Sequence, residues 1–170
     1  KFGARIAASN LISDIEKLVR YAHRYWAKVY VALNTILYDD ELNEALALIC
    51  SINEAGADAV IIQDMGLLEL DLQPIPLFAS TQTHNYSIPK IKFLERVGFQ
   101  RVILARELSL KQIKEIRKNT AVDLEFFIHG ALCVSFSGQC YLSQAMQGRS
   151  ANRGECAQPC RLPYTLADGH

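Results

Sequence analysis

Several common protein signatures are absent from this sequence. No run of about 18 or more apolar residues occurs, so the sequence predicts no transmembrane helix. No secretory signal peptide is evident, and we therefore expect a cytoplasmic location. The 170 residues are half hydrophobic with a formal net charge of zero. This composition suits one globular core and argues against a strongly basic nucleic-acid binder.

Signatures of familiar catalytic sites are also missing. No glycine-rich dinucleotide fingerprint follows a predicted strand, and neither an H-E-x-x-H zinc site nor a G-x-S-x-G nucleophile elbow occurs. His129 and Cys133 form a conceivable Cys–His pair, but an extended chain would hold them roughly 13 Å apart. Ser137 lacks an evident base partner. Proteolysis therefore has little support from nucleophile–base pairs.

Charge is distributed unevenly along the chain. Residues 29–89 contain nine acidic side chains and no Lys or Arg, whereas residues 90–118 contain nine basic side chains against three acids. A local basic face of this kind can bind a polyanion. The alternative, which we favour, is that these residues form solvated helix faces of opposite sign.

Short apolar runs alternate with amphipathic stretches, which is the pattern of repeated β-α units. Each central run is almost continuously apolar, as expected for parallel strands that are buried on both faces. The predicted strands are residues 29–33, 59–63, 77–81, 101–105 and 124–128, with a truncated one at 2–5.

Helix signals lie between the predicted strands. Ser13 with Glu16 forms a capping box that predicts the start of the first helix. Residues 130–163 are rich in Gly, Ser, Cys, Gln and Arg and predict a loop with one short helix. The apolar face of the first helix is predicted to be Ile15, Leu18, Val19, Ala22 and Trp26. The later helices are predicted from Asp39 or Asp40 to Gly56, from Ser87 to Gly98, and from Ser109, capped with Gln112, to near Asn119.

Successive β-α units imply right-handed crossovers and a parallel sheet, either a (β/α)8 barrel or an open doubly wound sheet. A polar residue follows each predicted strand, as the active-site rim of a barrel requires. We therefore predict an α/β fold. Residues 1–129 form a partial (β/α)8 TIM-like barrel of about five to six β-α units, and the Cys-rich segment 130–170 packs on the same domain. Exposed sheet edges could pair two copies into a homodimer. The predicted rim residues are Asn34, Asp64, Gln82, Arg106 and His129.

Four cysteines lie close together in the sequence, at Cys133, Cys140, Cys156 and Cys160, with the spacing C-x6-C-x15-C-x3-C. Structural zinc usually has two tight cysteine knuckles, and only the last pair here is close. Disulfides would need an oxidising compartment, whereas iron–sulfur ligands tolerate irregular spacing. Spacing alone favours an iron–sulfur cluster only modestly over zinc or unrelated buried thiols. Cys50 lies apart, in a predicted helix, and is expected in the core.

The run EFFIHGALCVSFSGQCYLSQAMQGRSANRGECAQPCRLPY resembles the signature of the collagenase-like peptidase family of unassigned catalytic type, family U, number thirty-two. The upstream pieces NTIL, ADAVIIQDMG, ASTQTHN and VILARELSL resemble strands of that family's barrel. The resemblance extends over nearly the whole chain, and the cysteine segment carries its most specific part.

The resemblance implies two activities. The better-understood members that this chain resembles are iron–sulfur proteins that hydroxylate RNA bases or a quinone precursor without molecular oxygen. We therefore expect hydroxylation of a tRNA wobble uridine or a large-subunit rRNA cytidine, with prephenate as a small-molecule oxygen donor or required metabolite. The family's four-iron, four-sulfur cluster would be held by Cys133, Cys140, Cys156 and Cys160. The alternative is a collagenase-like peptidase.

Further site residues are expected at the strand ends and beside the cysteines. For Arg153 and Arg161, fixing the cysteine loop through carbonyls is an equal alternative to binding substrate. His84 and Tyr86 could stack a base, although we favour loop packing. Glu125 is expected to pair with an arginine of the barrel interior. The predicted catalytic residues are His129, Asp64 and Glu107, and the predicted substrate-binding residues are Asn34, Gln82, Arg106, Arg149, Asn152 and Arg153.

Overall fold

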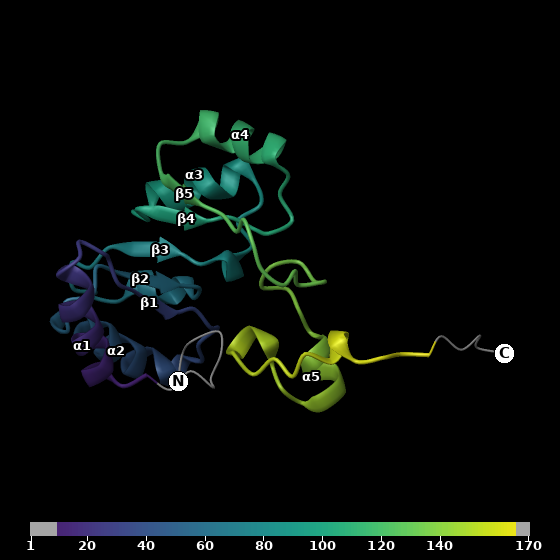
Figure 1. Cartoon of the computed structure of the whole chain (residues 1–170), viewed down its shortest axis with the longest axis horizontal. Coiled ribbons are helices and arrows are strands. Elements are labelled where there is room, and N and C mark those ends of the chain that lie inside the picture. Colours follow the sequence, from purple (N-terminus) through teal and green to yellow (C-terminus); the bar gives the residue numbers. More distant parts are fainter. Residues whose placement is uncertain (1–9, 166–170) are drawn as a thin grey trace.

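The computed structural model describes residues 10–165, which contain a five-stranded parallel sheet with the consecutive order β1-β2-β3-β4-β5 (Figure 1). The register pairs Val31 with Val60, and Val102 with Leu124. The predicted strand at residues 2–5 lies outside the described residues. The strands are β1 (Tyr30–Leu33), β2 (Ala59–Ile62), β3 (Leu77–Ala79), β4 (Arg101–Ile103) and β5 (Asp123–Glu125).

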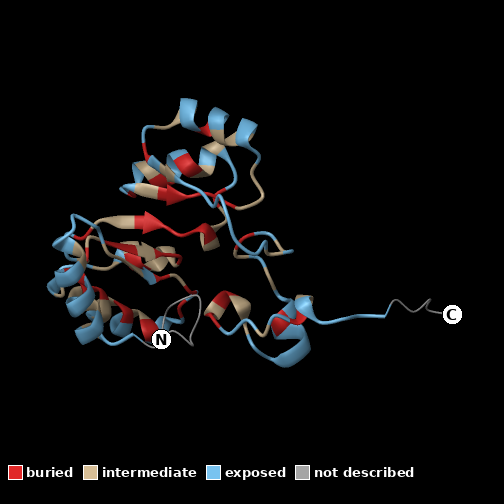
Figure 2. Ribbon diagram, viewed as in Figure 1, coloured by how far each residue is buried: buried red, intermediate tan, exposed pale blue. Residues whose placement is uncertain are grey.

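Helices α1 (Ile12–His23), α2 (Leu42–Glu54), α3 (Ile88–Arg96) and α4 (Leu110–Asn119) contribute to one apolar core against the sheet. Ile49 of α2 and Leu94 of α3 are buried in the same cluster as Val60 and Val102 of the strands. Figure 2 shows this buried layer, with the outer faces of the helices exposed. Removal of this apolar area from water is the main stabilisation of the β-α layers.

Three of the four predicted helix starts are confirmed. Ser87 is the N-cap of α3. Ser109 and Gln112 form the capping box of α4, with Gln112 N donating to Ser109 Oγ at 3.3 Å. A 3-10 turn begins at Asp39 and leads directly into α2. The short helix predicted among residues 130–163 is α5 (Leu142–Gln147).

The prediction for the first helix is wrong at both ends. Helix α1 begins at Ile12, and the Asp14 carboxylate accepts a hydrogen bond from Leu11 N at 3.3 Å, so the Ser13–Glu16 capping box does not form. Trp26 lies beyond the end of α1 with a positive φ of 61° and is 95% exposed. Leu18 is also exposed. The helix therefore buries a narrower stripe than its apolar residues predict.

The strands begin close to their predicted positions, and all except β1 end earlier than predicted. The chain leaves β3 at Ala79 because Ser80 caps a 3-10 turn, with its hydroxyl accepting from Gln82 N at 3.1 Å. Strand β5 ends at Glu125, so the predicted continuation to residue 128 is wrong. Phe127 and Ile128 are exposed, and no further strand pairs with β5 among the described residues.

The sheet face opposite the helices carries a small mixed cluster. The Tyr30 and Phe78 rings meet edge to face with centroids 4.9 Å apart, and the Arg101 guanidinium lies 4.7 Å from the Phe78 centroid. Arg101 also pairs with Glu125 at 3.3 Å and with Asp123 at 3.5 Å. This confirms the predicted arginine partner of Glu125.

Consecutive strand order with helices on one face differs from a doubly wound sheet, whose order reverses and whose helices cover both faces. The described sheet therefore has the local arrangement of β-α units in a barrel wall, but closure into a barrel stays a prediction. Within residues 10–165, no helix has the length and apolarity needed to cross a membrane.

Asp58 ties the end of α1 to the amino ends of the first two strands. Its Oδ2 accepts a hydrogen bond from Val29 N at 2.7 Å and lies 2.9 Å from His23 Nε2. Burial alone would raise the pKa of this carboxyl, but the hydrogen bonds from His23 and Val29 outweigh burial. The pKa of Asp58 therefore lies below its ordinary value of 3.8.

We predict that Asp58→Ala lowers the free energy of unfolding by about 1–2 kcal/mol at neutral pH, because Val29 N and His23 lose their acceptor. Since the folded-state pKa is the lower one, the contribution of the carboxylate is fully present above about pH 4. It is lost as the pH falls through the folded-state pKa. Denaturant unfolding between neutral pH and about pH 3 measures this difference. Asp71→Ala, at an exposed loop position, is the control. If the difference in free energy of unfolding between Asp58→Ala and wild type is the same at acidic and neutral pH, the assignment is contradicted.

Candidate functional site

The loop between Cys133 and Cys140 is held at the strand ends by Ser137. Ser137 is fully buried, and its N–H and hydroxyl both donate to the Glu107 carboxylate, the hydroxyl at 3.1 Å. Arg106 Nε donates to Ser137 Oγ at 3.2 Å, and the Thr81 hydroxyl approaches the same oxygen at 3.5 Å. Residues that follow β3 and β4 thus fix the middle of the cysteine loop.

Gly138 brings the same loop against the backbone of the segment after β3. A Cβ at Gly138 would lie 1.8 Å from the Gln82 carbonyl oxygen, and the residue has a φ of +71°. Both facts require glycine, because other residues have a Cβ and rarely adopt this conformation. The contact makes Gln82 a backbone docking point for the loop, in addition to its predicted role in binding substrate.

A second anchor lies further along the segment, at Arg153. Its guanidinium makes a two-pronged contact with the Glu41 carboxylate, both bonds at 2.9 Å, donates to Ile36 O at 2.8 Å and stacks 3.9 Å from the Tyr38 centroid. The hydrogen bonds with Glu41 raise the pKa of Arg153. Asn152 is buried, and its carbonyl accepts from Ile36 N at 3.3 Å. These contacts match the alternative in which arginine fixes the loop.

The four clustered cysteines are free thiols on this anchored segment. Cys156 is exposed, and Cys133, Cys140 and Cys160 are half-buried. Arg161 donates to Leu132 O at 2.6 Å, which links the neighbour of Cys160 to the neighbour of Cys133. The donor set suits a soft metal centre. Among residues 10–165, however, no three His, Cys, Asp or Glu side chains gather closely enough to hold a metal ion. The cluster therefore stays a prediction.

The remaining predicted site residues divide into those at the strand ends and those on the surface. Asp64 accepts backbone hydrogen bonds at both oxygens, from Leu37 N and Gly66 N, each at 2.9 Å. The Asn34 amide donates to Ser80 Oγ at 3.2 Å. His129 and Arg149 are exposed. Because β5 ends at Glu125, His129 is not at a strand end as predicted.

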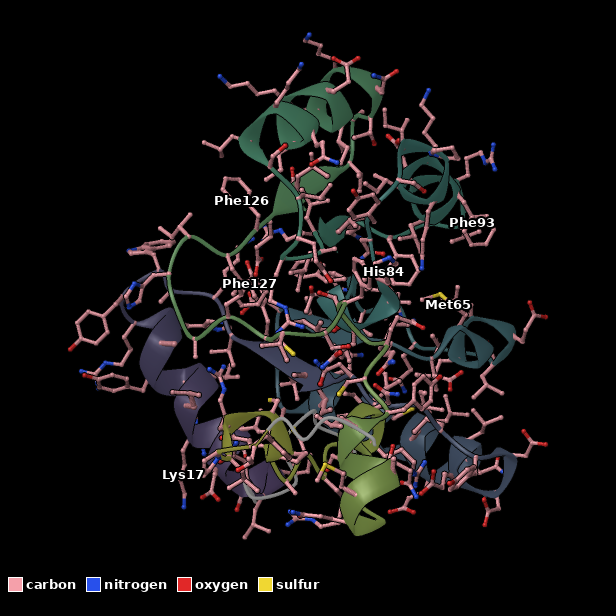
Figure 3. All side chains as sticks on the ribbon, turned by 90° about the vertical axis from the view of Figure 1, so that its right-hand side faces the viewer. Lys17, Met65, His84, Phe93, Phe126 and Phe127 are labelled. Atoms are coloured by element: carbon pink, nitrogen blue, oxygen red, sulfur yellow. The ribbon has the colours of Figure 1, made fainter. Side chains whose placement is uncertain are left out.

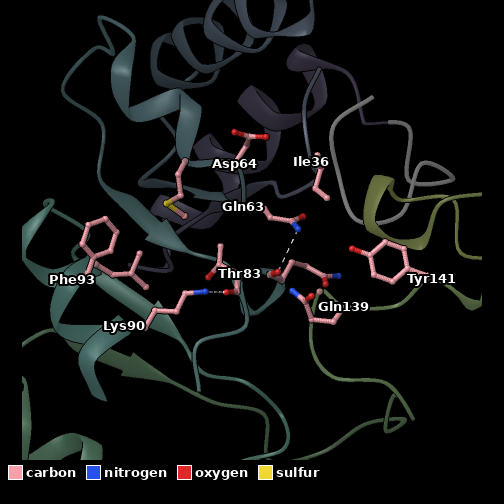
Figure 4. A pocket seen from close by; sticks show the side chains of 12 residues that line it. Ile36, Gln63, Asp64, Thr83, Lys90, Phe93, Gln139 and Tyr141 are labelled. Atoms are coloured by element: carbon pink, nitrogen blue, oxygen red, sulfur yellow. Dashed lines mark hydrogen bonds between the residues drawn. The ribbon is translucent and has the colours of Figure 1, made fainter. Parts of the chain in front are cut away.

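A cavity of about 330 Å³ opens between the strand ends, α3 and the cysteine segment (Figure 4). Gln63 and Gln82 line it from the segments that follow β2 and β3, and Lys90 and Phe93 line it from α3. Tyr141, the residue after Cys140, lines it from the cysteine segment. Lys90 donates to Thr83 O, and burial lowers the pKa of its ammonium. In Figure 3, which views the molecule from the side of the cysteine segment, Met65 and Phe93 lie on the same side as His84.

Two polar atoms at this edge are buried without a partner, one on Gln63, which the sequence reasoning missed, and one on His84, which it considered. Gln63 is 9% exposed, and its Oε1 has no hydrogen-bond partner within the described part of the chain. His84 Nδ1 is in the same condition. The His84 ring stacks on Tyr86 and meets Phe136 edge to face, each at 5.7 Å, which agrees with the favoured loop packing. A polar residue at the end of an otherwise apolar strand was the signal for Gln63.

The whole chain, residues 1–170, matches Peptidase family U32 and belongs to that family. It is 60% identical over 167 residues to the 23S rRNA 5-hydroxycytidine C2501 synthase of Escherichia coli K12, covering 98% of this chain and 26% of that protein. It is 36% identical over 155 residues to tRNA hydroxylation protein P of the same species, covering 89% and 34%. It is 32% identical over 177 residues to the Collagenase of Porphyromonas gingivalis, covering 97% and 42%.

The chain therefore spans between 26% and 42% of the length of these three relatives. A solved structure of the U32 peptidase Mk0906 has a TM-score of 0.58 at 18% identity and covers 73% of this chain and 55% of that one. At this identity the structural likeness supports the fold alone. The family resemblance inferred from the cysteine segment is confirmed, and the family contains proteins named both for RNA hydroxylation and for proteolysis.

We predict that Gly138→Ala releases residues 133–140 from the strand ends, because its Cβ would collide with the Gln82 carbonyl oxygen. Amide hydrogen exchange in this loop, and alkylation of Cys133 and Cys140, should accelerate by about tenfold or more. Gly148→Ala is the matched control. Its φ of +67° is similar, but a Cβ there meets nothing within 4 Å. It should cost only the left-handed backbone energy of about 1–2 kcal/mol. Equal exchange in the two variants would show that the close contact does not hold the loop.

Proposed function

We propose that this chain acts in the hydroxylation of an RNA base, with a large-subunit rRNA cytidine as the first candidate and a tRNA wobble uridine as the second. The observation that carries this proposal is the 60% identity, over 98% of the chain, to the rRNA 5-hydroxycytidine synthase. Identity to the tRNA hydroxylation protein is 36% and to the collagenase 32%. An RNA substrate would also account for the exposed lysines and arginines of α3 and α4 as phosphate contacts.

The reaction replaces a ring C–H by C–OH, so two electrons leave the base and an oxygen atom enters it. It therefore needs an oxygen donor and an electron acceptor. We propose that a small molecule supplies the oxygen, with prephenate as the candidate, and that Cys133, Cys140, Cys156 and Cys160 hold a four-iron, four-sulfur cluster. Such a cluster would pass on electrons one at a time when bound, so a two-electron acceptor outside this chain would complete the balance.

The chain's own residues position this chemistry. Glu107 and Arg106 hold the cysteine loop through Ser137, and Arg153 holds the following segment through Glu41. Of the three predicted acid–base residues, Asp64 and Glu107 accept hydrogen bonds at both carboxylate oxygens. His129 is exposed and is the one we retain as the candidate proton-transfer group.

The peptidase alternative is supported by the names of two relatives, a collagenase at 32% identity and an uncharacterized protease of Methanocaldococcus jannaschii at 42%, but not by a nucleophile in the described residues. Ser137 does have a carboxylate partner in Glu107, contrary to the expectation from the sequence, but the residue is 0% exposed and its hydrogen bonds fasten the loop. A nucleophile must reach a substrate carbonyl, and Ser137 cannot. Cys133 would be occupied if it binds iron.

We predict that Cys156→Ser removes the cluster and the hydroxylated base, because one of four ligands is lost. Protein purified without air is examined by visible absorption and iron content. Ribosomal RNA and tRNA from cells carrying the variant are analysed by nucleoside mass spectrometry. Cys50→Ser is the matched control, since Cys50 lies on α2 and outside the cysteine segment.

The control should keep iron, colour and the modified nucleoside. A colourless, iron-free wild-type protein under these conditions contradicts the cluster. Unchanged nucleosides in a deletion strain contradict RNA hydroxylation altogether.

A further inference from the structure

One polar atom beside the cavity is buried without a hydrogen-bond partner among the described residues, the side-chain amide oxygen of Gln63. The Gln63 Nε2 donates to Gln82 O at 3.3 Å, which fixes the orientation of this amide. Its Oε1 therefore remains an acceptor, and no partner for it exists in residues 10–165. A buried acceptor without a partner costs about 1–3 kcal/mol, so the site favours a molecule that supplies an N–H or O–H.

The other walls suit a flat, uncharged ring. Phe93 and Tyr141 lie at opposite sides of the cavity, and both are substantially exposed at its mouth (Figure 4). Gln139 supplies a second amide from the residue before Cys140. Lys90 already donates to Thr83 O and has further N–H donors for a ring carbonyl. A volume of about 330 Å³ is at the small end of ligand sites and is sufficient for one nucleoside.

The same walls are poorly suited to a small dicarboxylate. Among the described lining residues, Lys90 is the one cation, and burial lowers the pKa of its ammonium. The Asp64 carboxylate lines the same space and would repel an anion. With one cation and one carboxylate, the lining carries no net charge, which suits a neutral heterocycle better than a dicarboxylate.

We propose that this cavity is the pocket for an unstacked pyrimidine base, with Gln63 Oε1 accepting a hydrogen bond from the cytosine amino group or the uracil ring N–H. Enzymes that act on a base in RNA or DNA take it out of its stack and recognise its pairing edge in this way. The assignment rests on the proposed function for its biological meaning, because it would place the base next to Cys140. The basic outer faces of α3 and α4 adjoin the Lys90 wall and suit the phosphates of the same RNA.

The test uses the purified protein and free nucleosides, with dissociation constants measured by calorimetry or saturation-transfer NMR. Cytidine and uridine should bind, and N4,N4-dimethylcytidine and 3-methyluridine, which lack the donor, should bind about tenfold more weakly. Gln63→Met, which keeps the side-chain shape without its polar atoms, should bind the parent nucleosides about tenfold more weakly and lose the discrimination against methylation.

Gln100→Leu is the matched control, since Gln100 is exposed just before β4, at the opposite end of the sheet. It should leave both properties unchanged. If Gln63→Met does not fold, as judged by its melting transition, the methylated nucleosides still test the proposal on the wild-type protein.

Equal binding of parent and methylated nucleosides overturns the proposal. Malonate serves as the probe for a small dicarboxylate. If malonate displaces the nucleosides from the wild-type protein but not from Lys90→Met, the proposal is overturned and the cavity is assigned to an acid. Nucleoside mass spectrometry separates this outcome from the proposed function. If Gln63→Met still hydroxylates RNA at the wild-type rate, only the pocket assignment is contradicted. If nucleosides bind in a Gln63-dependent manner but no RNA is hydroxylated, only the proposed function is contradicted.

Discussion

The contact between Gly138 and the Gln82 carbonyl is the constraint on which the site depends. A backbone can approach another backbone this closely only where no side chain intervenes, and here a Cβ would be 1.8 Å from the oxygen. The contact fixes the middle of the 133–140 loop, so Cys133 and Cys140 lie on either side of a point on the strand-end edge. It also places Gln139 and Tyr141 as one wall of the cavity. The positions of the Cys133 and Cys140 thiols and of this cavity wall therefore depend on the same Gly138–Gln82 contact.

The order of β-α units could be predicted from sequence because each unit carries its own signals. An apolar run and a serine cap are local features, and Ser87 and Ser109 behaved as predicted. The failures occurred where non-local contacts decide the outcome. Trp26 and Leu18 are apolar by composition, but α1 ends at His23 and buries only the stripe around Val19. Strand β5 is shorter than the apolar run in its sequence because no strand lies beyond it in the described residues.

The residue types of the site could be predicted from sequence, but most of their contacts could not. Glu107 and Arg106 were chosen as catalytic or substrate-binding groups because charged residues at strand ends suit such work, and for Arg153 fixing the loop was an equal alternative. The structure uses all three to fasten the cysteine segment. Which partner a long side chain selects depends on segments distant in sequence, such as Glu41, 112 residues before Arg153. Gln63 was overlooked because a single polar residue at the end of an apolar strand looks like an ordinary strand end.

The exposed apolar side chains after β5 bear on what lies beyond this sheet. Phe126, Phe127 and Ile128 are exposed although they continue an apolar strand pattern, whereas Phe78, on the sheet face opposite the helices, is buried and contacts Arg101. Such surface is costly in water and is usually covered. The longer relatives provide room for further strands, which would complete the predicted barrel, whereas pairing of sheet edges between two copies would cover β1 and β5 alone. The exposed apolar residues therefore mark the chain just after β5 as the place where either partner would pack.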